Sequence, residues 1–541
     1  MPASIQLLDP TDNAVVALRA LAAGETVEAW TLLTAVPAKH KFAAEPLPAG
    51  SDVRMYGTIA GRTTRDVQRG ELLTRENTTH AVAAPEIRGQ RSRWKMPDVS
   101  RWKGRTFDGY RRADGRCGTA NYWVVLPMVF CENRNVDVMR EALTKGLGYA
   151  ITTPYTEFVA QLASAHRSGS ALDSVQLAAS GETQRVFPGV DGVKFLTHAM
   201  GCGGTRQDAR ALCGLLAGYI AHPNVAGATV LSLGCENAQS SILREELARR
   251  QPSGTKPVLF FEQQRAASEQ SLIATALRET IRGIAAANDL RREPCPLSEL
   301  VLGLKCGGSD GFSGISANPA LGHCSDLLCA LGGSGVLCEF PELCGAEQWL
   351  CDRCEDPALA EKFLDLMTRY DARAREVGSG FEMNPSPGNI RDGLITDAMK
   401  SLGAARKSGT APIADVLDYP ELVARRGGVT LLCTPGNDVE ATTALTGSGC
   451  NLIVFTTGLG TPTGNPICPV VKMSTNTDLT TRMPDLIDFD AGPIIHGKET
   501  IATAGERLLD TLIEVASGRI TTASTRLAQD DFLPWKRGVS L

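Results

Sequence analysis

Residues 228–250 read ATVLSLGCENAQSSILREELARR, an apolar run followed by a longer helix-like segment. The same order returns at 256–289, where KPVLFFEQQ precedes AASEQSLIATALRETIRGIAAAND. Short apolar runs are typical of buried strands, and strands that alternate with helices of this length indicate parallel sheets. The sequence therefore predicts parallel α/β units.

The rest of the chain divides by pattern. Residues 1–80 alternate short apolar runs with turns, which predicts a small all-β module. Residues 81–105 mix Pro, Gly, Arg and Lys without periodicity and are interpreted as a linker. A Pro/Gly interruption near 383–393 divides the remainder into an α/β catalytic domain at 106–385 and a C-terminal α/β domain at 386–541. The fold class is therefore α/β, with a small N-terminal β module in front of parallel α/β domains.

Composition excludes several classes of partner. The net charge of −5 over 541 residues offers no basic face for nucleic acid. The chain has no run of 18 apolar residues and no basic segment followed by an apolar run at its start, so we expect no membrane span, no signal peptide and a cytoplasmic protein. Sixteen scattered cysteines then favour reduced thiols, a few of which could ligate a metal.

Four cysteines share one context. Cys131, Cys202, Cys235 and Cys306 each stand where a predicted buried strand gives way to a loop. Loops beyond the carboxyl ends of parallel strands line the ligand crevice of open α/β sheets, so these thiols could converge on one site. Thiolates suit iron, either in an iron–sulfur cluster or as a single Fe²⁺ with mixed ligands. The alternative for each cysteine is a small core residue.

Polar residues suited to acid–base chemistry lie beside these cysteines. His198 precedes Cys202 by four residues, and Ser309 and Asp310 follow Cys306 in GLKCGGSDGFSG, residues 303–314. A histidine in this position is a candidate general acid or base. The alternative for His198 is a hydrogen-bonded packing histidine.

Several long motifs together resemble one known family. They include GYRRADGRCGTANYWVVLP at 109–127, GLKCGGSDGFSGISANPALG at 303–322, EFPELCGAEQWL at 339–350, FTTGLGTPTGNPICPVVKMSTNTDL at 455–479 and IDFDAGPIIHGKE at 487–499. These segments resemble the altronate dehydratase and galactarate dehydratase family of sugar-acid lyases, and two of them are more similar to the altronate branch. The N-terminal stretch around AKHKF resembles the SAF domain of these enzymes.

The resemblance implies an iron-dependent hydro-lyase that dehydrates a small-molecule sugar acid to a 2-keto-3-deoxy acid. The four cysteines form the pool of iron ligands, for Fe²⁺ or a [4Fe-4S] cluster. Proton transfer falls to His198 and Asp310, with Ser309 beside them. The substrate-binding candidates are His40, Lys41, Asn318, Asn389, Asn437 and Lys472.

Two departures from the family pattern bear on the substrate. Ala120 and Leu459 stand where members of the family commonly have a basic residue. Arginine is the usual bidentate partner of carboxylates, so their loss leaves the exact acid open. The alternatives are galactarate dehydration, a sulfo-lyase acting on a related hydroxy acid, and a non-catalytic paralogue that binds a sugar acid. A homo-oligomer also stays open.

Overall fold

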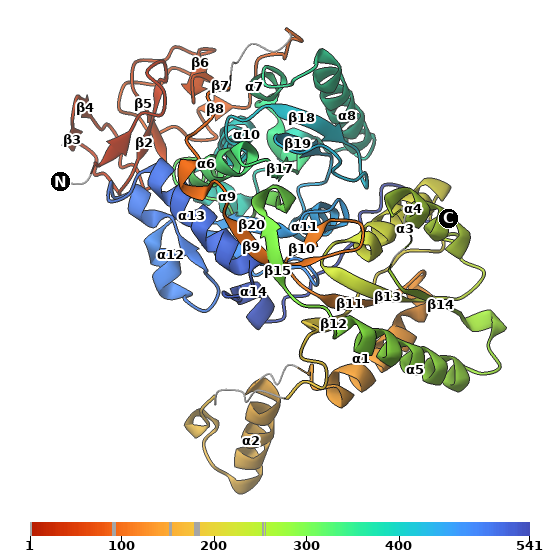
Figure 1. Cartoon of the computed structure of the whole chain (residues 1–541). Coiled ribbons are helices and arrows are strands. Elements are labelled where there is room, and N and C mark those ends of the chain that lie inside the picture. Colours follow the sequence, from red (N-terminus) through yellow and green to blue (C-terminus); the bar gives the residue numbers. More distant parts are fainter. Residues whose placement is uncertain (1–2, 89–93, 151–153, 178–183, 252–253, 255) are drawn as a thin grey trace.

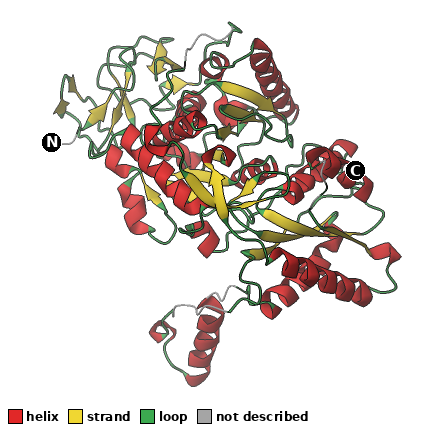
Figure 2. Cartoon of the chain, viewed as in Figure 1, coloured by secondary structure: helices red, strands yellow, loops and turns green. Residues whose placement is uncertain are grey.

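The computed structural model describes residues 3–88, 94–150, 154–177, 184–251, 254 and 256–541. Figure 1 shows the N-terminal strands gathered at one side of the molecule, followed by two regions in which helices flank sheets. Figure 2 shows that the strands of these two regions are enclosed by helices, whereas the N-terminal part is built from strands and loops. The predicted fold class is confirmed.

The β module consists of short antiparallel strands. They form three sheets with the orders β1-β2-β5, β3-β4 and β6-β7-β8. The bounds are β1 Ile5–Gln6, β2 Ala14–Ala17, β3 Thr26–Val27, β4 Trp30–Thr31, β5 Lys41–Ala43, β6 Asp52–Met55, β7 Thr58–Thr63 and β8 Thr78–Thr79. A small core that includes Val15, Val36 and Phe42 holds β1, β2 and β5 together.

The segment expected to be a linker is docked along its described C-terminal part. Trp102 is 2% exposed, and its Nε1 donates to Asp510 Oδ1 at 2.9 Å. Arg105 forms a 2.8 Å ion pair with the same carboxylate. Asp510 lies on α13 (Ile501–Ala516), so residues near the end of the chain anchor the connection to the β module.

The first α/β unit is a four-stranded parallel sheet with the order β12-β11-β13-β14. The strands are β11 Tyr122–Pro127, β12 Gly192–Phe195, β13 Val225–Ser232 and β14 Val258–Glu262, and the helices are α1 Asn133–Gly146, α2 Pro154–Ser168, α3 Arg206–Ala221, α4 Ser240–Arg250 and α5 Glu269–Ala287. All eight residues of β13 are buried, as expected for a parallel strand covered on both faces. In Figure 1, α2 projects away from the sheet.

A small antiparallel sheet lies between the two α/β units. Its order is β10-β9-β15, with bounds β9 Thr106–Arg111, β10 Cys117–Gly118 and β15 Glu293–Pro296. Because β9 precedes the first unit and β15 follows it, this sheet closes that unit before the chain enters the second.

The second α/β unit contains a seven-stranded, entirely parallel sheet with the order β18-β19-β17-β16-β20-β21-β22. Its strands are β16 Val301–Cys306, β17 Ser334–Leu337, β18 Ile413–Leu417, β19 Val429–Leu432, β20 Leu452–Thr457, β21 Val470–Ser474 and β22 Phe489–Asp490. The remaining helices are α6 Ala317–Ala330, α7 Glu347–Cys351, α8 Pro357–Glu376, α9 Pro387–Arg391, α10 Asp397–Ala405, α11 Asp438–Gly447, α12 Thr477–Arg482 and α14 Ala523–Arg526. Among the described residues, no helix is long and apolar enough to cross a membrane.

The boundary expected after residue 385 falls inside this unit. β16 and β17 precede that position, β18 to β22 follow it, and all seven strands share one sheet. The Pro/Gly interruption belongs to the connection between β17 and β18, where Ser386 caps the short helix α9. The division between the α/β units instead falls between α5 and β16.

Both parallel sheets reverse their direction of growth at a central strand. The chain proceeds from β16 to β17 on one side, and later places β20 on the other side of β16. In the first unit, β12 and β13 flank β11 in the same way. Ligands of open α/β sheets bind outside the carboxyl ends of the strands at such a switch point. The chain therefore has two candidate ligand sites, one at the carboxyl end of β11 and one at that of β16.

Candidate active site

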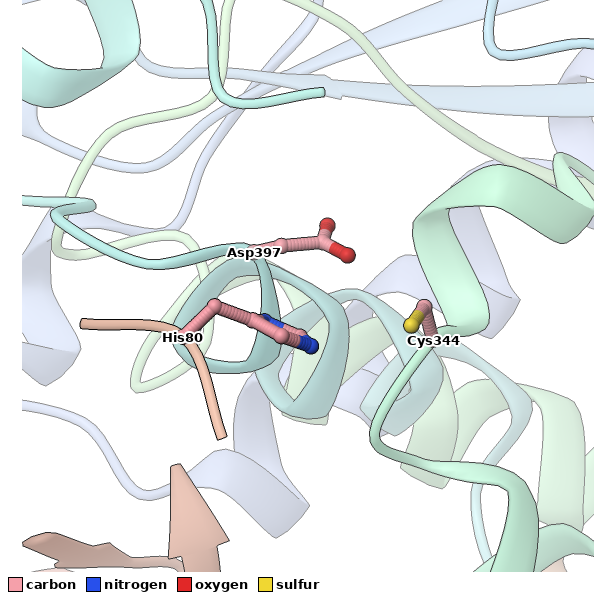
Figure 3. A group of neighbouring side chains, drawn as sticks. All are labelled: His80, Cys344 and Asp397. Atoms are coloured by element: carbon pink, nitrogen blue, oxygen red, sulfur yellow. The ribbon is translucent and has the colours of Figure 1, made fainter. Parts of the chain in front are cut away.

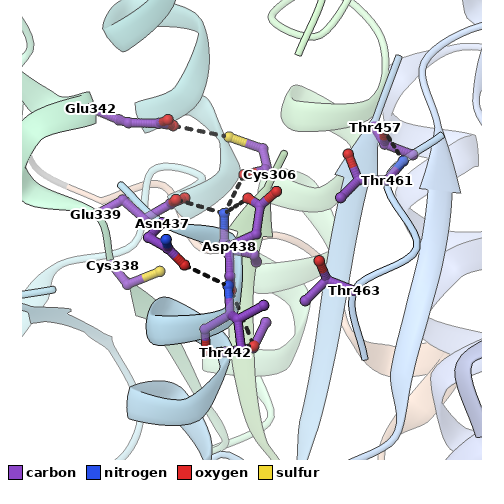
Figure 4. A network of polar contacts seen from close by, with 12 residues as sticks. Cys306, Cys338, Glu339, Glu342, Asn437, Asp438, Thr442, Thr457, Thr461 and Thr463 are labelled. Carbon is purple, nitrogen blue, oxygen red and sulfur yellow. Dashed lines mark hydrogen bonds and ion pairs between the residues drawn. The ribbon is translucent and has the colours of Figure 1, made fainter. Parts of the chain in front are cut away.

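The switch point of the seven-stranded sheet holds a buried polar centre. Cys306 ends β16 and is 1% exposed. Figure 4 shows Glu342 pointing toward Cys306, and Glu339 and Asp438 approaching the same centre from other loops. These residues follow β16, β17 and β19, so the sheet itself brings their loops together.

Lys305 joins two of these loops. Its ammonium group lies 2.5 Å from Glu339 Oε1 and 2.6 Å from Asp438 Oδ1, and it donates to the carbonyl of Cys306 at 2.5 Å. The side chains of Lys305 and Glu339 are fully buried. A buried charge requires such partners, so the pairing fixes the geometry of all three loops.

Two further lysines complete the centre. Lys407 Nζ donates to Cys306 Sγ at 2.7 Å, and Lys400 Nζ lies 2.7 Å from Glu342 Oε1. The Cys306 thiol in turn lies 3.5 Å from Glu342 Oε2. Within the described residues, Glu339 Oε2 has no hydrogen-bond partner. That oxygen lies 3.7 Å from Lys407 Nζ, so it faces an ammonium group without a hydrogen bond to it.

The two carboxyl groups have opposite pKa shifts. Burial and the nearby negative charge of Glu342 raise the pKa of Glu339 to about 7. Burial alone would raise the pKa of Glu342 as well, but the three ammonium groups, above all Lys400, lower it to about 2. Burial raises the pKa of the Cys306 thiol, and Lys407 opposes that rise. Paired groups whose pKa values are pushed apart are typical of acid–base sites.

Asp310 is a buried carboxylate in the loop that follows β16, and both of its oxygens accept hydrogen bonds. Its Oδ1 accepts from the amide of Phe312 at 3.2 Å and from Ser313 Oγ at 3.1 Å, and its Oδ2 accepts from Thr475 Oγ1 at 3.1 Å. Lys39 of the β module forms a 3.0 Å ion pair with Asp310 Oδ2. Asp310 thus organises the loop, while Ser309 is buried beside it.

The β module reaches this loop with residues 39–41. Lys41 is buried, its Nζ donates to the carbonyl of Gly393 at 2.6 Å, and burial lowers its pKa to about 8. A Cβ on Gly311 or Gly393 would lie 2.3 or 2.4 Å from the carbonyl oxygen of Lys39, so both positions need glycine for this contact. His40 Nδ1 lies 3.2 Å from its neighbour Ala38 O. The positive charge that meets Asp310 comes from Lys39, one residue before the predicted His40 and Lys41.

The three predicted substrate-binding asparagines have structural partners. Asn318 donates to Gly403 O at 3.0 Å and accepts from Thr456 at 2.7 Å. Asn389 donates to Ser309 O at 2.7 Å and thereby holds the loop that follows β16. Asn437 caps α11, is exposed and stands at the rim of the centre. Of the three, Asn437 is the one placed where a ligand could meet it.

Lys472 is buried on β21, where its backbone amide donates to Asp488 Oδ2 at 2.9 Å. Its Nζ donates to the carbonyls of Thr461 and Thr463 and lies 4.1 Å from the centroid of the Phe455 ring. Burial lowers its pKa to about 7. Lys472 therefore supports the loop after β20 and does not reach into the centre.

The other three predicted iron ligands lie at the switch point of the four-stranded sheet. Cys131 follows β11, Cys202 follows β12 and Cys235 follows β13, and all three are exposed. Phe130 N donates to Met200 O at 3.0 Å and Ala238 N to Gly201 O at 3.1 Å, so the three loops lie side by side. Cys306 does not join them, because β16 belongs to the other sheet. Among the described residues, the three thiols do not form a group whose ligand atoms all lie within 4.8 Å of one another, so their convergence on one ion stays a prediction.

The charges around Cys306 do not favour a metal ion there. The Sγ of Cys306 and one oxygen each of Glu339 and Glu342 lie within 4.8 Å of one another. The buried ammonium groups of Lys305, Lys400 and Lys407 already bind these three side chains, so a divalent cation would meet three like charges. The exposed cysteines offer soft donors without a lysine in hydrogen-bond contact among the described residues.

His198 is placed as a packing residue. Its Nδ1 accepts from the amide of Met200 at 3.1 Å, which leaves Nε2 to donate to Pro127 O at 2.9 Å. Burial lowers its pKa to about 4. With both ring nitrogens engaged by the backbone, His198 holds the loop of Cys202 and is not available to a substrate. These contacts favour the packing interpretation of His198 over the catalytic one.

Sequence reasoning missed most of the charged groups of the centre. The groups that were missed are Lys39, Lys305, Glu339, Glu342, Lys400, Lys407 and Asp438. The first four lie within motifs quoted above, whereas Lys400, Lys407 and Asp438 lie outside them. A signal was present for Lys305, because a lysine inside an apolar strand requires a buried partner.

A β module in front of two parallel α/β units, with a buried acid–base centre at a switch point, defines a multidomain α/β enzyme. Residues 3–81 match the altronate/galactarate dehydratase SAF domain, residues 109–288 match the second domain of D-galactarate dehydratase/altronate hydrolase, and residues 297–540 match the C-terminal domain of D-galactarate/altronate dehydratase. The chain belongs to the altronate/galactarate dehydratase family.

Individual relatives agree over most of the chain. Altronate dehydratase of Escherichia coli is 35% identical over 98% of both chains, and that of Bacillus subtilis is 34% identical over 94% of both. The beta subunit of (2R)-sulfolactate sulfo-lyase from Chromohalobacter salexigens is 30% identical over 78% of this chain and 95% of its own.

Proposed function

We propose that the protein is an iron-dependent hydro-lyase that converts an altronate-like sugar acid to a 2-keto-3-deoxy acid and water. The observation that carries the proposal is the buried Glu339–Glu342 pair, whose pKa values are split by burial and by three lysines at a switch point. Family membership supplies the reaction class, and this pair supplies groups that could perform it.

The first chemical step is removal of a proton next to a carboxylate. Such a proton is weakly acidic, so the enzyme must neutralise the carboxylate and stabilise the charge that develops. Lys400 is 8% exposed, whereas Lys305 and Lys407 are 0% and 1% exposed. It donates to Asn384 Oδ1 at 2.7 Å, and Asn384 lies beside the exposed Gly436. We assign it to the substrate carboxylate.

Glu339 is assigned as the base. Its Oε2 has no hydrogen-bond partner among the described residues, and its pKa of about 7 lets it accept a proton near neutral pH. Its backbone adopts φ +68°, a left-handed conformation that is uncommon for a non-glycine residue. That strain fits a functional position.

Cys306 is assigned as the acid for the departing hydroxyl. Burial keeps the thiol protonated, and Lys407 at 2.7 Å would stabilise the thiolate that remains after proton transfer. The carbon–oxygen bond then breaks, water leaves and the resulting enol becomes the 2-keto acid. The proton taken by Glu339 and the proton given by Cys306 balance over one turnover.

Iron is assigned to Cys131, Cys202 and Cys235. Three thiolates on adjacent loops suit a cluster that keeps one iron open, which favours [4Fe-4S] over a single Fe²⁺. Bound there, iron would supply Lewis-acid chemistry at the loops of the four-stranded sheet, in the unit that does not carry Glu339 and Cys306. Cys306 leaves the ligand pool, because Lys407 already occupies its sulfur.

The substrate is assigned as an acid with one carboxylate. Leu459 is 37% exposed and lies beside Gly308, in the loop that follows β16. Compared with family members that have arginine at this position, the chain therefore lacks a cation beside the site. Ala120 is buried in the other unit, where its carbonyl accepts from Arg112 at 3.1 Å, so it does not bear on specificity. These placements favour an aldonate over galactarate or a sulfonated acid.

The test combines anaerobic purification, iron and sulfide analysis and a panel of altronate, galactarate and sulfolactate, with 2-keto acid and sulfite as readouts. Glu339→Gln should abolish turnover and keep iron, whereas Cys202→Ser should lose both. Cys433→Ser, a buried cysteine outside both centres, serves as the control. Full activity of Glu339→Gln would refute the assigned base, and unchanged iron in Cys202→Ser would refute the assigned ligands. Light scattering on the same sample measures the oligomeric state.

A further inference from the structure

A second cluster of metal-binding side chains lies at the boundary between the β module and the second α/β unit. One ligand atom each of His80, Cys344 and Asp397 lies within 4.8 Å of the others. Figure 3 shows the three side chains approaching one another from three separate segments. They follow β8, end the 3-10 turn Phe340–Leu343 and begin α10, respectively.

Two polar atoms of this cluster are buried, and the Asp397 carboxyl faces the Cys344 thiol. Within the described residues, neither His80 Nδ1 nor Asp397 Oδ2 has a hydrogen bond, and Asp397 is 1% exposed. A buried polar atom without a hydrogen bond costs about 1–3 kcal/mol. A cation between the two side chains would satisfy both atoms at once.

The backbone around the cluster is built for close approach. A Cβ on Gly345, whose φ is +98°, would lie 2.9 Å from Val82 Cγ1, so glycine lets the segment after His80 pack against the turn that carries Cys344. Thr396 Oγ1 donates to Ala60 O of β7 at 2.6 Å. The elements that carry the three ligands are therefore held together independently of any ion.

The cluster opens on a pocket with an excess of negative charge. The pocket has a volume of about 790 Å³ and is lined by Cys344, Glu347, Asp371, Arg375 and Glu382. Arg375 pairs with Asp371 at 2.6 Å and with Glu382 at 3.4 Å, so one cation faces three carboxylates. This balance favours binding of a cation.

We propose that His80, Cys344 and Asp397 bind one Zn²⁺ ion, which joins the β module to the second α/β unit and leaves a fourth position open to the pocket. Mixed nitrogen, sulfur and oxygen donors suit Zn²⁺, whereas Ca²⁺ and Mg²⁺ prefer oxygen alone. At such donors Zn²⁺ also binds more tightly than Fe²⁺. Tetrahedral zinc needs ligand atoms about 3.3–3.8 Å apart. The ligand atoms lie within 4.8 Å of one another, so binding would close any of these separations by at most about 1.5 Å.

The test measures zinc on the full-length chain after chelation, addition of Zn²⁺ and gel filtration. Cys344→Ser and His80→Gln should each bind one Zn²⁺ fewer per chain than the unmodified protein. His166→Gln changes a histidine of α2 and should bind the same number. With Co²⁺ in place of Zn²⁺, the thiolate-to-cobalt absorption should lose one cysteine's share in Cys344→Ser.

Two further measurements keep the proposal falsifiable if a variant folds poorly. Asp397→Asn keeps the side-chain volume and should weaken zinc binding at this site at least tenfold. Zn²⁺ should also protect Cys344 of the unmodified protein from alkylation, as read on its peptide by mass spectrometry. Equal zinc content in Cys344→Ser and the unmodified protein, alkylation of Cys344 unaffected by Zn²⁺, or occupancy by iron in preference to zinc would each overturn the proposal.

Discussion

Lys39 Nζ lies 3.0 Å from Asp310 Oδ2, and the Asp310 side chain is fully buried. Along the sequence, the whole first α/β unit lies between the two residues. Their ion pair therefore connects the β module to the loop that follows β16. Removing one partner of a buried pair leaves an uncompensated charge. Lys39→Met should therefore destabilise the protein by about 3 kcal/mol and lower kcat/KM, measured by denaturant unfolding and turnover.

The matched control for this prediction is Lys145→Met. Lys145 is 71% exposed and pairs with Glu141 on the surface of α1, so its loss should cost less than about 0.5 kcal/mol. The double variant Lys39→Met with Asp310→Asn should recover part of the stability, because the buried charge is gone. Equal effects of Lys39→Met and Lys145→Met would show that the pair couples nothing.

The raised pKa of Glu339 predicts that stability and catalysis depend on pH in opposite directions. Its pKa is raised from 4.5 to about 7, so between these values the folded state holds a proton that the unfolded chain has released. Its contribution to stability therefore falls as pH rises through this window. Catalysis needs the ionised base, so kcat/KM should rise about tenfold per pH unit up to about pH 7. A rate profile that is flat from pH 5 to pH 8 would contradict this assignment.

His198 should orient the loop of Cys202, the proposed iron ligand, and should not transfer a proton to or from the substrate. Because both ring nitrogens bond to the backbone, His198→Ala should loosen the loop of Cys202. We expect iron affinity to fall about 10–100-fold, as for other groups that orient metal ligands. The pH profile of the remaining activity should keep its shape. Loss of one limb of that profile, with iron retained, would instead identify His198 as a catalytic acid or base.

The sequence predicts the layers of this protein better than its site. Strand ends such as Cys131, Cys202 and Cys235 are visible because apolar runs stop there, and parallel strands must meet at one edge. Membership of one sheet or another is not visible, so Cys306 was grouped with thiols of a different sheet. The lysines of the centre come from a strand and two helical segments: Lys305 lies in β16, Lys400 in α10 and Lys407 in the 3-10 turn that follows α10. Their pairing with the carboxylates depends on the tertiary fold.

Leu459→Arg should shift the preference of the enzyme toward dicarboxylates. Leu459 lies beside Gly308, in the loop that follows β16, and is 37% exposed, so a longer cationic side chain has room there. An arginine that binds a second carboxylate should raise the ratio of kcat/KM for galactarate over altronate at least about tenfold, or about 1.4 kcal/mol. Leu177→Arg, at a leucine that is 49% exposed elsewhere, should leave the ratio unchanged. If both variants fold and give the same ratio, residue 459 does not face the substrate, and specificity must come from another position on the rim.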